Sequence, residues 1–361
     1  MRRTAIGALL LVTLLVAASC GSDEPKTTSN TGGLPTHDAD LAGMLTATAP
    51  KGDCKIGISV PNLRDPFYIA LAYGEVDEAE RWGCKVVGVR DAGGYANLND
   101  QISQIENLAQ LGPNVILLSA ADYDGTGAVA CEMARRGIKV INVATMSNCD
   151  QVTYGVNTYD PAVGQKMAEW LGGKNPNAKV VLLSGPAGAN WSMERAEGFK
   201  KTIAEKYPGI KVLAEKNTDI DPAQAQQVME DWLTAFPEID AVIGISDLLG
   251  SGASRALQGA DRKSKTLVVT STMSEEAEAG LKSDKLDYVI AERPVLTGRL
   301  GTQLAIKALN GEQVKLPDFQ PLITVPSAVF YVDQVGYTAA DLSNYNSSMD
   351  RAPADFNPSK T

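Results

Sequence analysis

From residue 55 onward the chain alternates between short runs of β-branched apolar residues and amphipathic segments of helical length. The runs include KIGISV, KVVGV, NVILLSA and KVINVA in the first half, then KVVLLSG, DAVIGI, TLVVTS and DYVIAE in the second. Near-continuous apolar runs are typical of strands buried on both faces of a parallel sheet. The intervening segments, such as 66–82 and 97–111, place apolar residues at helical spacing. The alternation predicts an α/β fold with doubly wound, mostly parallel sheets.

The number of strand–helix units predicts two lobes. Four units precede the segment VTYGVNTYD, and about five follow it. One open sheet of nine or ten strands would be large for a chain of 361 residues, so two sheets are more economical. Ligands of open α/β sheets bind outside the carboxyl ends of the strands. We therefore expect two sheets whose carboxyl ends surround one cleft.

The N-terminus has the pattern of an export signal. Two arginines precede the largely apolar run Ala5–Ala18, which is too short to span a bilayer of ~30 Å. The sequence VAASC at its end resembles a bacterial lipobox, which implies that residues 1–19 are removed and that Cys20 is acylated; plain secretion is the alternative. Residues 20–50 are expected to form a flexible tether. The lipid would hold the body on the outer face of the cytoplasmic membrane.

Four cysteines remain after this segment, an even number in an oxidising compartment. Cys54 and Cys84 each stand one residue before an apolar run, and the first residues of neighbouring parallel strands lie within disulfide reach. We predict the disulfides Cys54–Cys84 and Cys131–Cys149, with four buried free thiols as the alternative. No CxxC spacing occurs, which disfavours a metal site.

Charge and histidine content exclude several functions. The 33 basic and 43 acidic residues give a net charge of −10, which argues against a nucleic-acid partner. The single histidine, His37, lies in the expected tether, so the folded body lacks an imidazole for catalysis or zinc binding. Phosphate-binding glycine motifs with the full spacing are absent, and we expect no cofactor.

Aromatic and hydrogen-bonding side chains gather at the expected carboxyl ends of the strands. Aromatic rings cover the C–H faces of a sugar while polar groups bind its hydroxyls, so the set predicts a sugar pocket. Each aromatic residue on its own is equally well explained by packing in the core. The set comprises Asp65, Phe67, Tyr68, Tyr95, Thr145, Asn157, Asn190, Trp191, Ser246, Asp247, Thr272 and Glu292.

The stretch from about Cys54 to Tyr337 resembles the ribose-binding type of periplasmic solute-binding protein. The matching segments occur in order: IGISV with DPFYIALAYGEVDEAERWG, VVLLSGPAG with MERAEGF, AVIGISD with ASRALQGA, and DKLDYVIAERP. The resemblance implies two Rossmann-like lobes joined by three hinge segments, the type I periplasmic binding protein fold. It implies a protein that closes on a sugar and delivers it to the permease of an ABC importer. Nothing in the sequence indicates oligomerisation, so we expect a monomer.

The same resemblance implies lobe boundaries. The first lobe would comprise residues 51–157 and 293–320, and the second lobe residues 158–292 and 321–340. Residues 341–361 offer no strong pattern, and we expect them to form a loosely attached tail.

The resemblance also implies roles for site residues. Phe67 and Tyr68 match the family's stacking pair, and Glu292 matches its hinge glutamine. Ala144-Thr145 replaces the Asp–Arg pair of ribose and galactose binders, and Met193 stands where they carry an arginine. Without an arginine clamp an acidic ligand is disfavoured. The resemblance thus favours a neutral sugar or polyol.

Two alternatives remain. The segments AGGYANL and GVNTYD are more similar to the trimethylamine-N-oxide-sensing branch, whose members present a ligand to a sensor kinase. That branch would imply a small cationic or N-oxide osmolyte in an aromatic cage. The other alternative is a secreted carbohydrate-active enzyme that uses Asp65, Asp247 and Glu292 as acid and base, although nothing in the sequence sets two of these carboxyls at a working distance.

Overall fold

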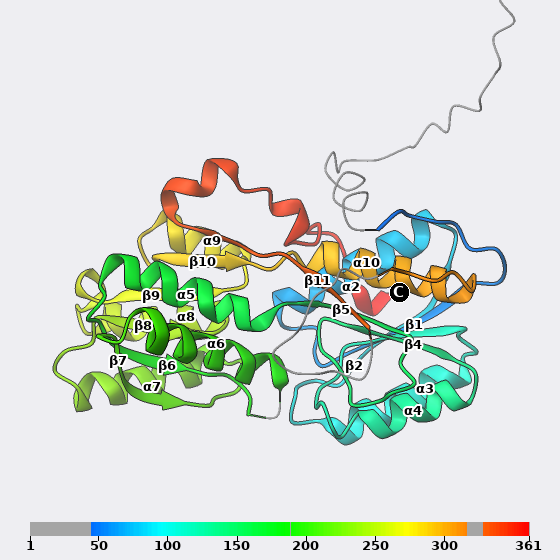
Figure 1. The fold of residues 1–361 in the computed structure, drawn as a ribbon, viewed down its shortest axis with the longest axis horizontal. Coiled ribbons are helices and arrows are strands. Elements are labelled where there is room, and N and C mark those ends of the chain that lie inside the picture. Colours follow the sequence, from blue (N-terminus) through cyan, green and yellow to red (C-terminus); the bar gives the residue numbers. More distant parts are fainter. Residues whose placement is uncertain (1–44, 188, 316–327, 361) are drawn as a thin grey trace, which may run out of the picture. The chain divides into compact units, whose positions relative to one another are not determined.

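The computed structural model describes residues 45–187, 189–315 and 328–360 and contains two six-stranded sheets. The first sheet has the order β11-β5-β4-β3-β1-β2, and all its neighbouring strands are parallel. We call this sheet and its helices the first lobe (Figure 1). Its strands are β1 (Lys55–Val60), β2 (Lys85–Asp91), β3 (Val115–Leu118), β4 (Lys139–Val143), β5 (Tyr154–Thr158) and β11 (Val329–Val332).

The second sheet repeats this order in the second half of the chain, as β12-β10-β9-β8-β6-β7. Its strands are parallel, except that β12 is antiparallel to β10. The repeated topology confirms the predicted α/β fold with two lobes. The strands of this second lobe are β6 (Lys179–Leu183), β7 (Lys211–Lys216), β8 (Ala241–Gly244), β9 (Leu267–Ser271), β10 (Tyr288–Ala291) and β12 (Val335–Tyr337).

Helices connect the parallel strands, and two of them are capped by the aspartate of an Asp-Pro pair. Asp65 accepts a hydrogen bond from the backbone N–H of Phe67, and Asp221 accepts from those of Ala223 and Gln224. Within the described ranges no helix is long and apolar enough to cross a membrane. The first lobe carries α2 (Pro66–Arg81), α3 (Leu98–Gln110), α4 (Gly127–Arg135) and α10 (Pro294–Leu309). The second carries α5 (Asp160–Lys174), α6 (Asn190–Lys206), α7 (Pro222–Ala235), α8 (Asp247–Gly259) and α9 (Glu275–Lys282), and the 3₁₀ turns are η1 (Lys263–Lys265), η2 (Ala339–Asn344), η3 (Ser347–Met349) and η4 (Pro358–Lys360).

The chain passes between the lobes three times. The first two passages follow β5 and β10, and the third lies between β11 and β12, at residues 333–334. The boundary predicted at residue 320 therefore differs from the structure. The reason is that Phe330 and Val332 are buried in the core of the first lobe, so β11 extends the first sheet beside β5 before the chain leaves it.

In each lobe, helices pack closely enough to require glycine at the contact. Between α2 and α10, a Cβ atom on Gly74 would lie 2.2 Å from the carbonyl oxygen of Val295. Between α5 and α6, a Cβ atom on Gly198 would lie 2.2 Å from that of Pro161. Glycine allows the backbones to approach this closely. The two contacts fix α2 and α6, whose first turns line the cavity described below.

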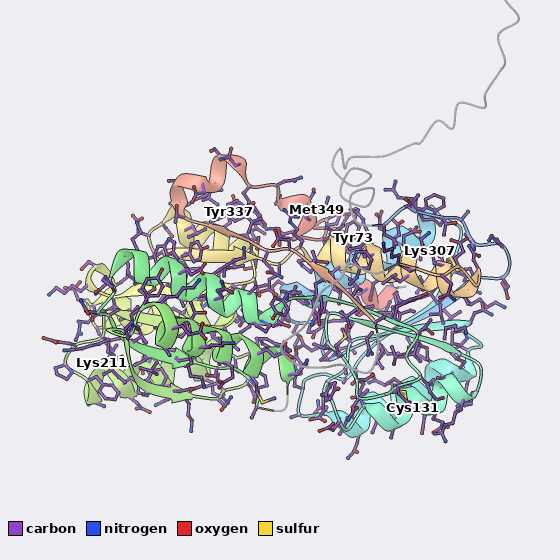
Figure 2. All side chains as sticks on the ribbon, viewed as in Figure 1. Tyr73, Cys131, Lys211, Lys307, Tyr337 and Met349 are labelled. Atoms are coloured by element: carbon purple, nitrogen blue, oxygen red, sulfur yellow. A yellow bond between two sulfur atoms is a disulfide. The ribbon has the colours of Figure 1, made fainter. Side chains whose placement is uncertain are left out.

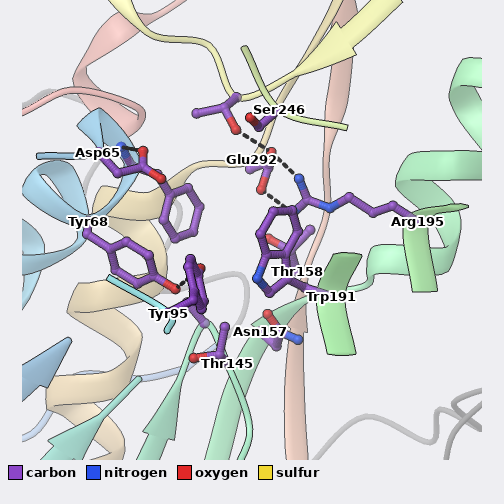
Figure 3. A pocket seen from close by; sticks show the side chains of 13 residues that line it. Asp65, Tyr68, Tyr95, Thr145, Asn157, Thr158, Trp191, Arg195, Ser246 and Glu292 are labelled. Atoms are coloured by element: carbon purple, nitrogen blue, oxygen red, sulfur yellow. Dashed lines mark hydrogen bonds and ion pairs between the residues drawn. The ribbon is translucent and has the colours of Figure 1, made fainter. Parts of the chain in front are cut away.

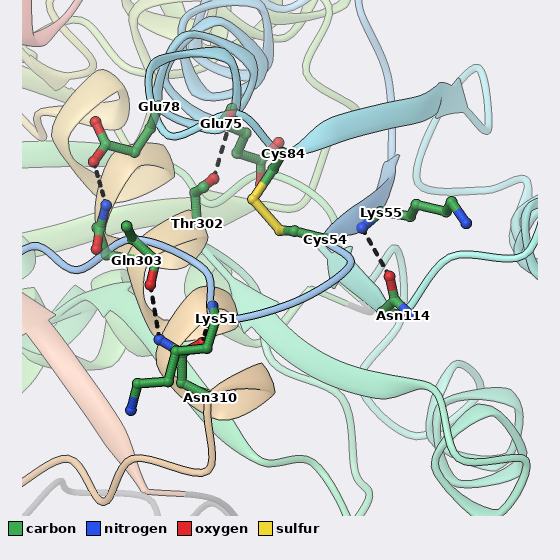
Figure 4. Close-up of a disulfide and its surroundings, with 11 residues drawn as sticks. Lys51, Cys54, Lys55, Glu75, Glu78, Cys84, Asn114, Thr302, Gln303 and Asn310 are labelled. Atoms are coloured by element: carbon green, nitrogen blue, oxygen red, sulfur yellow. Dashed lines mark hydrogen bonds between the residues drawn. A yellow bond between two sulfur atoms is a disulfide. The ribbon is translucent and has the colours of Figure 1, made fainter.

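Both predicted disulfides are confirmed, and both lie in the first lobe. Cys54–Cys84 joins the residues that precede β1 and β2, with Cα atoms 4.8 Å apart (Figure 4). Cys131–Cys149 joins α4 to the segment after β4, with Cα atoms 5.5 Å apart. The first lobe is therefore cross-linked at two points.

The C-terminal segment, residues 339–360, contacts both lobes and is not the loosely attached tail that the sequence predicts. On the second lobe, the guanidinium of Arg351 lies 2.5 Å from the Glu278 carboxylate. On the first lobe, Phe356 packs edge-on against Tyr73, which Figure 2 labels, with ring centroids 5.3 Å apart. The segment therefore forms a tie across the two lobes.

Candidate functional site

A cavity lies at the carboxyl ends of both sheets and contains most of the predicted site residues (Figure 3). Asn190 and Asp247 are buried but do not line it, whereas Thr158 and Arg195 line it and are not predicted from the sequence. The full lining is Asp65, Phe67, Tyr68, Tyr95, Ala144, Thr145, Asn157, Thr158, Trp191, Arg195, Ser246, Thr272 and Glu292.

The first lobe supplies three of the aromatic rings around this cavity. Asp65 caps α2 and thereby places Phe67 and Tyr68 in its first turn. The hydroxyls of Tyr68 and Tyr95 are hydrogen-bonded at 2.7 Å. Trp191, from α6 of the second lobe, approaches Tyr95 with a centroid separation of 6.1 Å. Rings from both lobes thus face one another across the cavity.

The second lobe supplies a buried ion-pair network centred on Arg195. Its guanidinium donates to both carboxylate oxygens of Glu292, at 2.9 and 2.6 Å, and to Asp160 at 2.8 Å. Glu292 also accepts a hydrogen bond from the Thr272 hydroxyl at 2.9 Å. The guanidinium lies over the Trp191 ring, 4.9 Å from its centroid. The network connects the start of α5, the first turns of α6 and the end of β10, next to two of the passages between the lobes.

The arginine of this site lies two residues beyond the position that the family resemblance indicates. Met193 is 47% exposed, whereas Arg195 is buried. Arg195 follows Trp191 by one helical turn, so both side chains lie on the face of α6 that lines the cavity. The pocket therefore contains an arginine that the sequence does not predict. Because Asp160 and Glu292 balance its charge, Arg195 is nevertheless no clamp for an anionic ligand.

Burial changes the protonation of two carboxyl groups near the cavity. It raises the pKa of Asp65 to about 6, against the opposing effect of the hydrogen bond from the Phe67 backbone. It raises the pKa of Asp247 to about 8, and the negative charge of Asp65 adds to this rise. At neutral pH Asp247 is therefore mostly protonated and is able to donate a hydrogen bond as well as accept one.

Four buried polar atoms in this region lack a hydrogen-bond partner among the described residues. They are Oγ1 of Thr158, Nε1 of Trp191, Oγ of Ser246 and Oδ2 of Asp247. An unpaired buried polar atom costs roughly 1–3 kcal/mol. A ligand rich in hydroxyl groups that satisfied these atoms would recover this free energy.

Corresponding turns in the two lobes border the cavity in an unusual backbone conformation. Ala144 follows β4 with φ 64°, and Thr272 follows β9 with φ 70°. Residues other than glycine avoid this left-handed region, β-branched ones most strongly, and such strain clusters at functional sites. The two turns indicate that this edge of both sheets is shaped for binding.

The family model described as a periplasmic binding protein domain matches residues 56–313. The chain belongs to the periplasmic binding protein family. The ribose import binding protein RbsB of Escherichia coli is 31% identical over 277 residues, which cover 76% of this chain and 91% of RbsB. A sugar ABC transport system substrate-binding protein from Bordetella parapertussis, of known structure, is 31% identical with a TM-score of 0.83. The match covers 88% of this chain and 99% of that protein.

A second kind of relative has a different partner. The periplasmic protein TorT of Escherichia coli is 30% identical over 288 residues, which cover 77% of this periplasmic binding protein and 80% of TorT. TorT has been solved in complex with the TorS sensor domain, and that chain shares the fold with a TM-score of 0.71 at 21% identity. Family membership confirms the resemblance read from the sequence, and all three relatives are named as binding or periplasmic proteins rather than as enzymes.

Proposed function

We propose that this protein is the extracytoplasmic substrate-binding component of an ABC importer and binds a neutral sugar or sugar alcohol. The observation that carries the proposal is a buried cavity bordered by aromatic rings and by hydroxyl, amide and carboxyl groups from both lobes. Such rings cover the C–H faces of a sugar, and the polar groups bind its hydroxyls. Relatives that are named for ribose import and sugar transport support the same ligand class.

Binding is coupled to closure of the hinge. Phe67 and Tyr68 belong to the first lobe, and Trp191 and Ser246 belong to the second, so a ligand that contacts all four holds the lobes together. A ligand shifts the equilibrium toward closure by the difference in its affinity for the closed and open forms. The closed form then presents the outer faces of both lobes to the permease in one fixed arrangement.

The charged network serves positioning rather than catalysis. Arg195 and Glu292 hold the end of β10 and the first turns of α6 in place through their bidentate pair. Glu292 accepts hydrogen bonds on both carboxylate oxygens, with Thr272 as a further donor, so it has no role as a general acid in this arrangement. The alternative of a carbohydrate-active enzyme would therefore have only two of its three proposed catalytic carboxyl groups, those of Asp65 and Asp247.

A thermal-shift panel tests the ligand class. Pentoses, hexoses, polyols, trimethylamine-N-oxide and betaines are each added, and only a ligand of the folded protein raises the Tm. We expect a sugar or polyol to do so, and the variant Phe67→Ala to lose the rise. The control variant Phe236→Ala removes a similarly half-buried ring that does not line the cavity. This variant should keep the rise in Tm. Turnover of any sugar in the panel contradicts the proposal.

A sensory function is the second candidate, because TorT is about as similar to this chain as RbsB is. The fold and the closure mechanism would be the same, and the membrane partner would be a histidine kinase. Stabilisation by trimethylamine-N-oxide or a betaine, with no response to sugars or polyols, would favour the sensor over the importer.

We further propose that the protein is an exported, monomeric lipoprotein. The proposed signal peptide, residues 1–19, and the acylated Cys20 lie outside the described residues, as does most of the tether. Radiolabelled palmitate should be incorporated into the wild-type protein and not into Cys20→Ala. Equal labelling of the two proteins contradicts the lipid anchor.

A further inference from the structure

A second cavity adjoins the first and is the larger of the two. Its volume is about 500 Å³, against about 30 Å³ for the inner cavity on the same scale. Tyr95 lines both, so the two cavities are neighbours. The outer cavity also lies between the lobes, because Asp122 from the segment after β3 and Thr218 from the segment after β7 both line it.

The outer cavity has the chemistry of a site for hydroxyl groups. Among the described residues, its polar lining consists of acids, amides and a hydroxyl, with no lysine or arginine. Thr218 is only 7% exposed, and its Oγ1 has no hydrogen-bond partner among the described residues. The side-chain oxygen of Gln224 accepts a hydrogen bond from the backbone N–H of Asp219 at 3.0 Å. This hydrogen bond uses the amide oxygen of Gln224 and not its amide nitrogen. Tyr95 and Pro186 add apolar surface.

The sizes of the two cavities give them different roles. A single water molecule requires ~10–15 Å³ on this scale, so the inner cavity is narrow. The outer cavity is the larger of the two, and Thr218 and Asp122 line it but do not line the inner cavity.

We propose that the natural ligand is longer than one sugar unit: one unit occupies the inner cavity, and a second, linked unit extends past Tyr95 into the outer cavity, where Asp122 and Thr218 bind its hydroxyls. The ligand class is thus a disaccharide or a glycosylated polyol. This inference rests on the proposed function, since it takes the inner cavity to be a sugar site.

Isothermal titration with matched pairs of ligands tests the inference. Xylose is compared with xylobiose, glucose with maltose, cellobiose and trehalose, and sorbitol with maltitol. We expect at least one two-unit ligand to bind ten-fold or more tightly than its own single unit. Thr218→Val and Asp122→Asn, one from each lobe, should each weaken that ligand about two- to ten-fold, the effect of one lost hydrogen bond. Both should leave the single unit within two-fold.

The outcomes separate the inference from the function on which it rests. Thr234→Val, which alters an exposed threonine of α7, is the matched control and should leave both affinities unchanged. If a single unit binds as tightly as every two-unit ligand, or if the outer-cavity variants weaken both equally, the second subsite is wrong while the sugar-binding function stands. If no sugar or polyol of either length binds, the proposed function fails, and the subsite fails with it.

Discussion

The two lobes repeat one topology but are stabilised by different means. The first lobe contains both disulfides, and it contributes three aromatic rings to the inner cavity. The second lobe has no disulfide among its described residues, and the buried network of Arg195, Asp160 and Glu292 lies at the cavity itself. The first lobe is therefore a cross-linked platform for ligand contacts. In the second lobe, the residues that shape the site also contribute to folding stability.

Removing the central charge of the second lobe should have the largest effect on stability. Arg195→Met leaves two buried carboxylates without their partner, and breaking a buried ion pair in this way costs ~3–5 kcal/mol. Urea denaturation of the wild type and the variant measures this cost as the difference in their free energies of unfolding. The control Arg255→Met removes an exposed pair with Glu276 and should cost ~0–1 kcal/mol. Equal costs for the two variants would show that the network does not stabilise the second lobe.

Removing a disulfide from the first lobe should have the next largest effect. The double variant Cys54→Ala/Cys84→Ala opens a loop with a sequence separation of 30 residues, and the expected loss is ~2–4 kcal/mol. Cys131→Ala/Cys149→Ala opens one of 18 residues and should lose slightly less, because loop-closure entropy grows slowly with length. Hydrogen exchange should increase mainly in the first lobe. An equal increase in both lobes would mean that they unfold as one unit, and the contrast between them would disappear.

The unliganded protein should become less stable as the pH rises from about 4 to about 8. The folded pKa values of Asp65 and Asp247 are about 6 and about 8, so the folded protein keeps protons that the unfolded chain has already lost, and the free energy of unfolding falls. Asp247→Asn should remove more of the fall than Asp65→Asn does, because the pKa of Asp247 is raised further. Burial raises the pKa of Glu194 and Asp350 as well, so some slope should remain. A profile that is as steep in Asp247→Asn as in the wild type contradicts this assignment.

The C-terminal segment should have the smallest effect on stability and a measurable effect on closure. Phe356→Ala removes the edge-on contact with Tyr73 on the first lobe, worth ~1 kcal/mol. Tyr345→Phe instead removes the hydrogen bond to the carbonyl oxygen of Met273 on the second lobe. If the segment ties the lobes together, both variants should speed ligand dissociation in stopped-flow measurements. An effect of only one variant would assign the segment to a single lobe.

The sequence predicts most of the fold, because buried parallel strands leave a simple pattern. The runs of β-branched residues indicate the strands of both sheets except β5, β11 and β12. The positions of Cys54 and Cys84, each just before such a run, predict their disulfide. The edge strand β11 escapes prediction because VFYV is short and follows a long gap after α10, so its partner β5 is not evident from the sequence.

The site is predicted less completely, because the family resemblance points to position 193 whereas the helical spacing points to position 195. Arg195 follows Trp191 by four residues and therefore lies on the same face of α6, and Met193 does not. The C-terminal segment is missed for another reason. Its contacts depend on single residues, such as Arg351 and Phe356, that show no periodicity.

The left-handed turn at Thr272 has a consequence for how specificity can change over evolution. A threonine in this conformation costs of the order of 1–3 kcal/mol, and glycine or asparagine would adopt it more easily. Its hydroxyl, however, holds Glu292 in place. A glycine at this position in a descendant protein would relieve the backbone strain but would no longer hold the Glu292 carboxylate. Position 272 therefore links folding stability to the geometry of the ligand site.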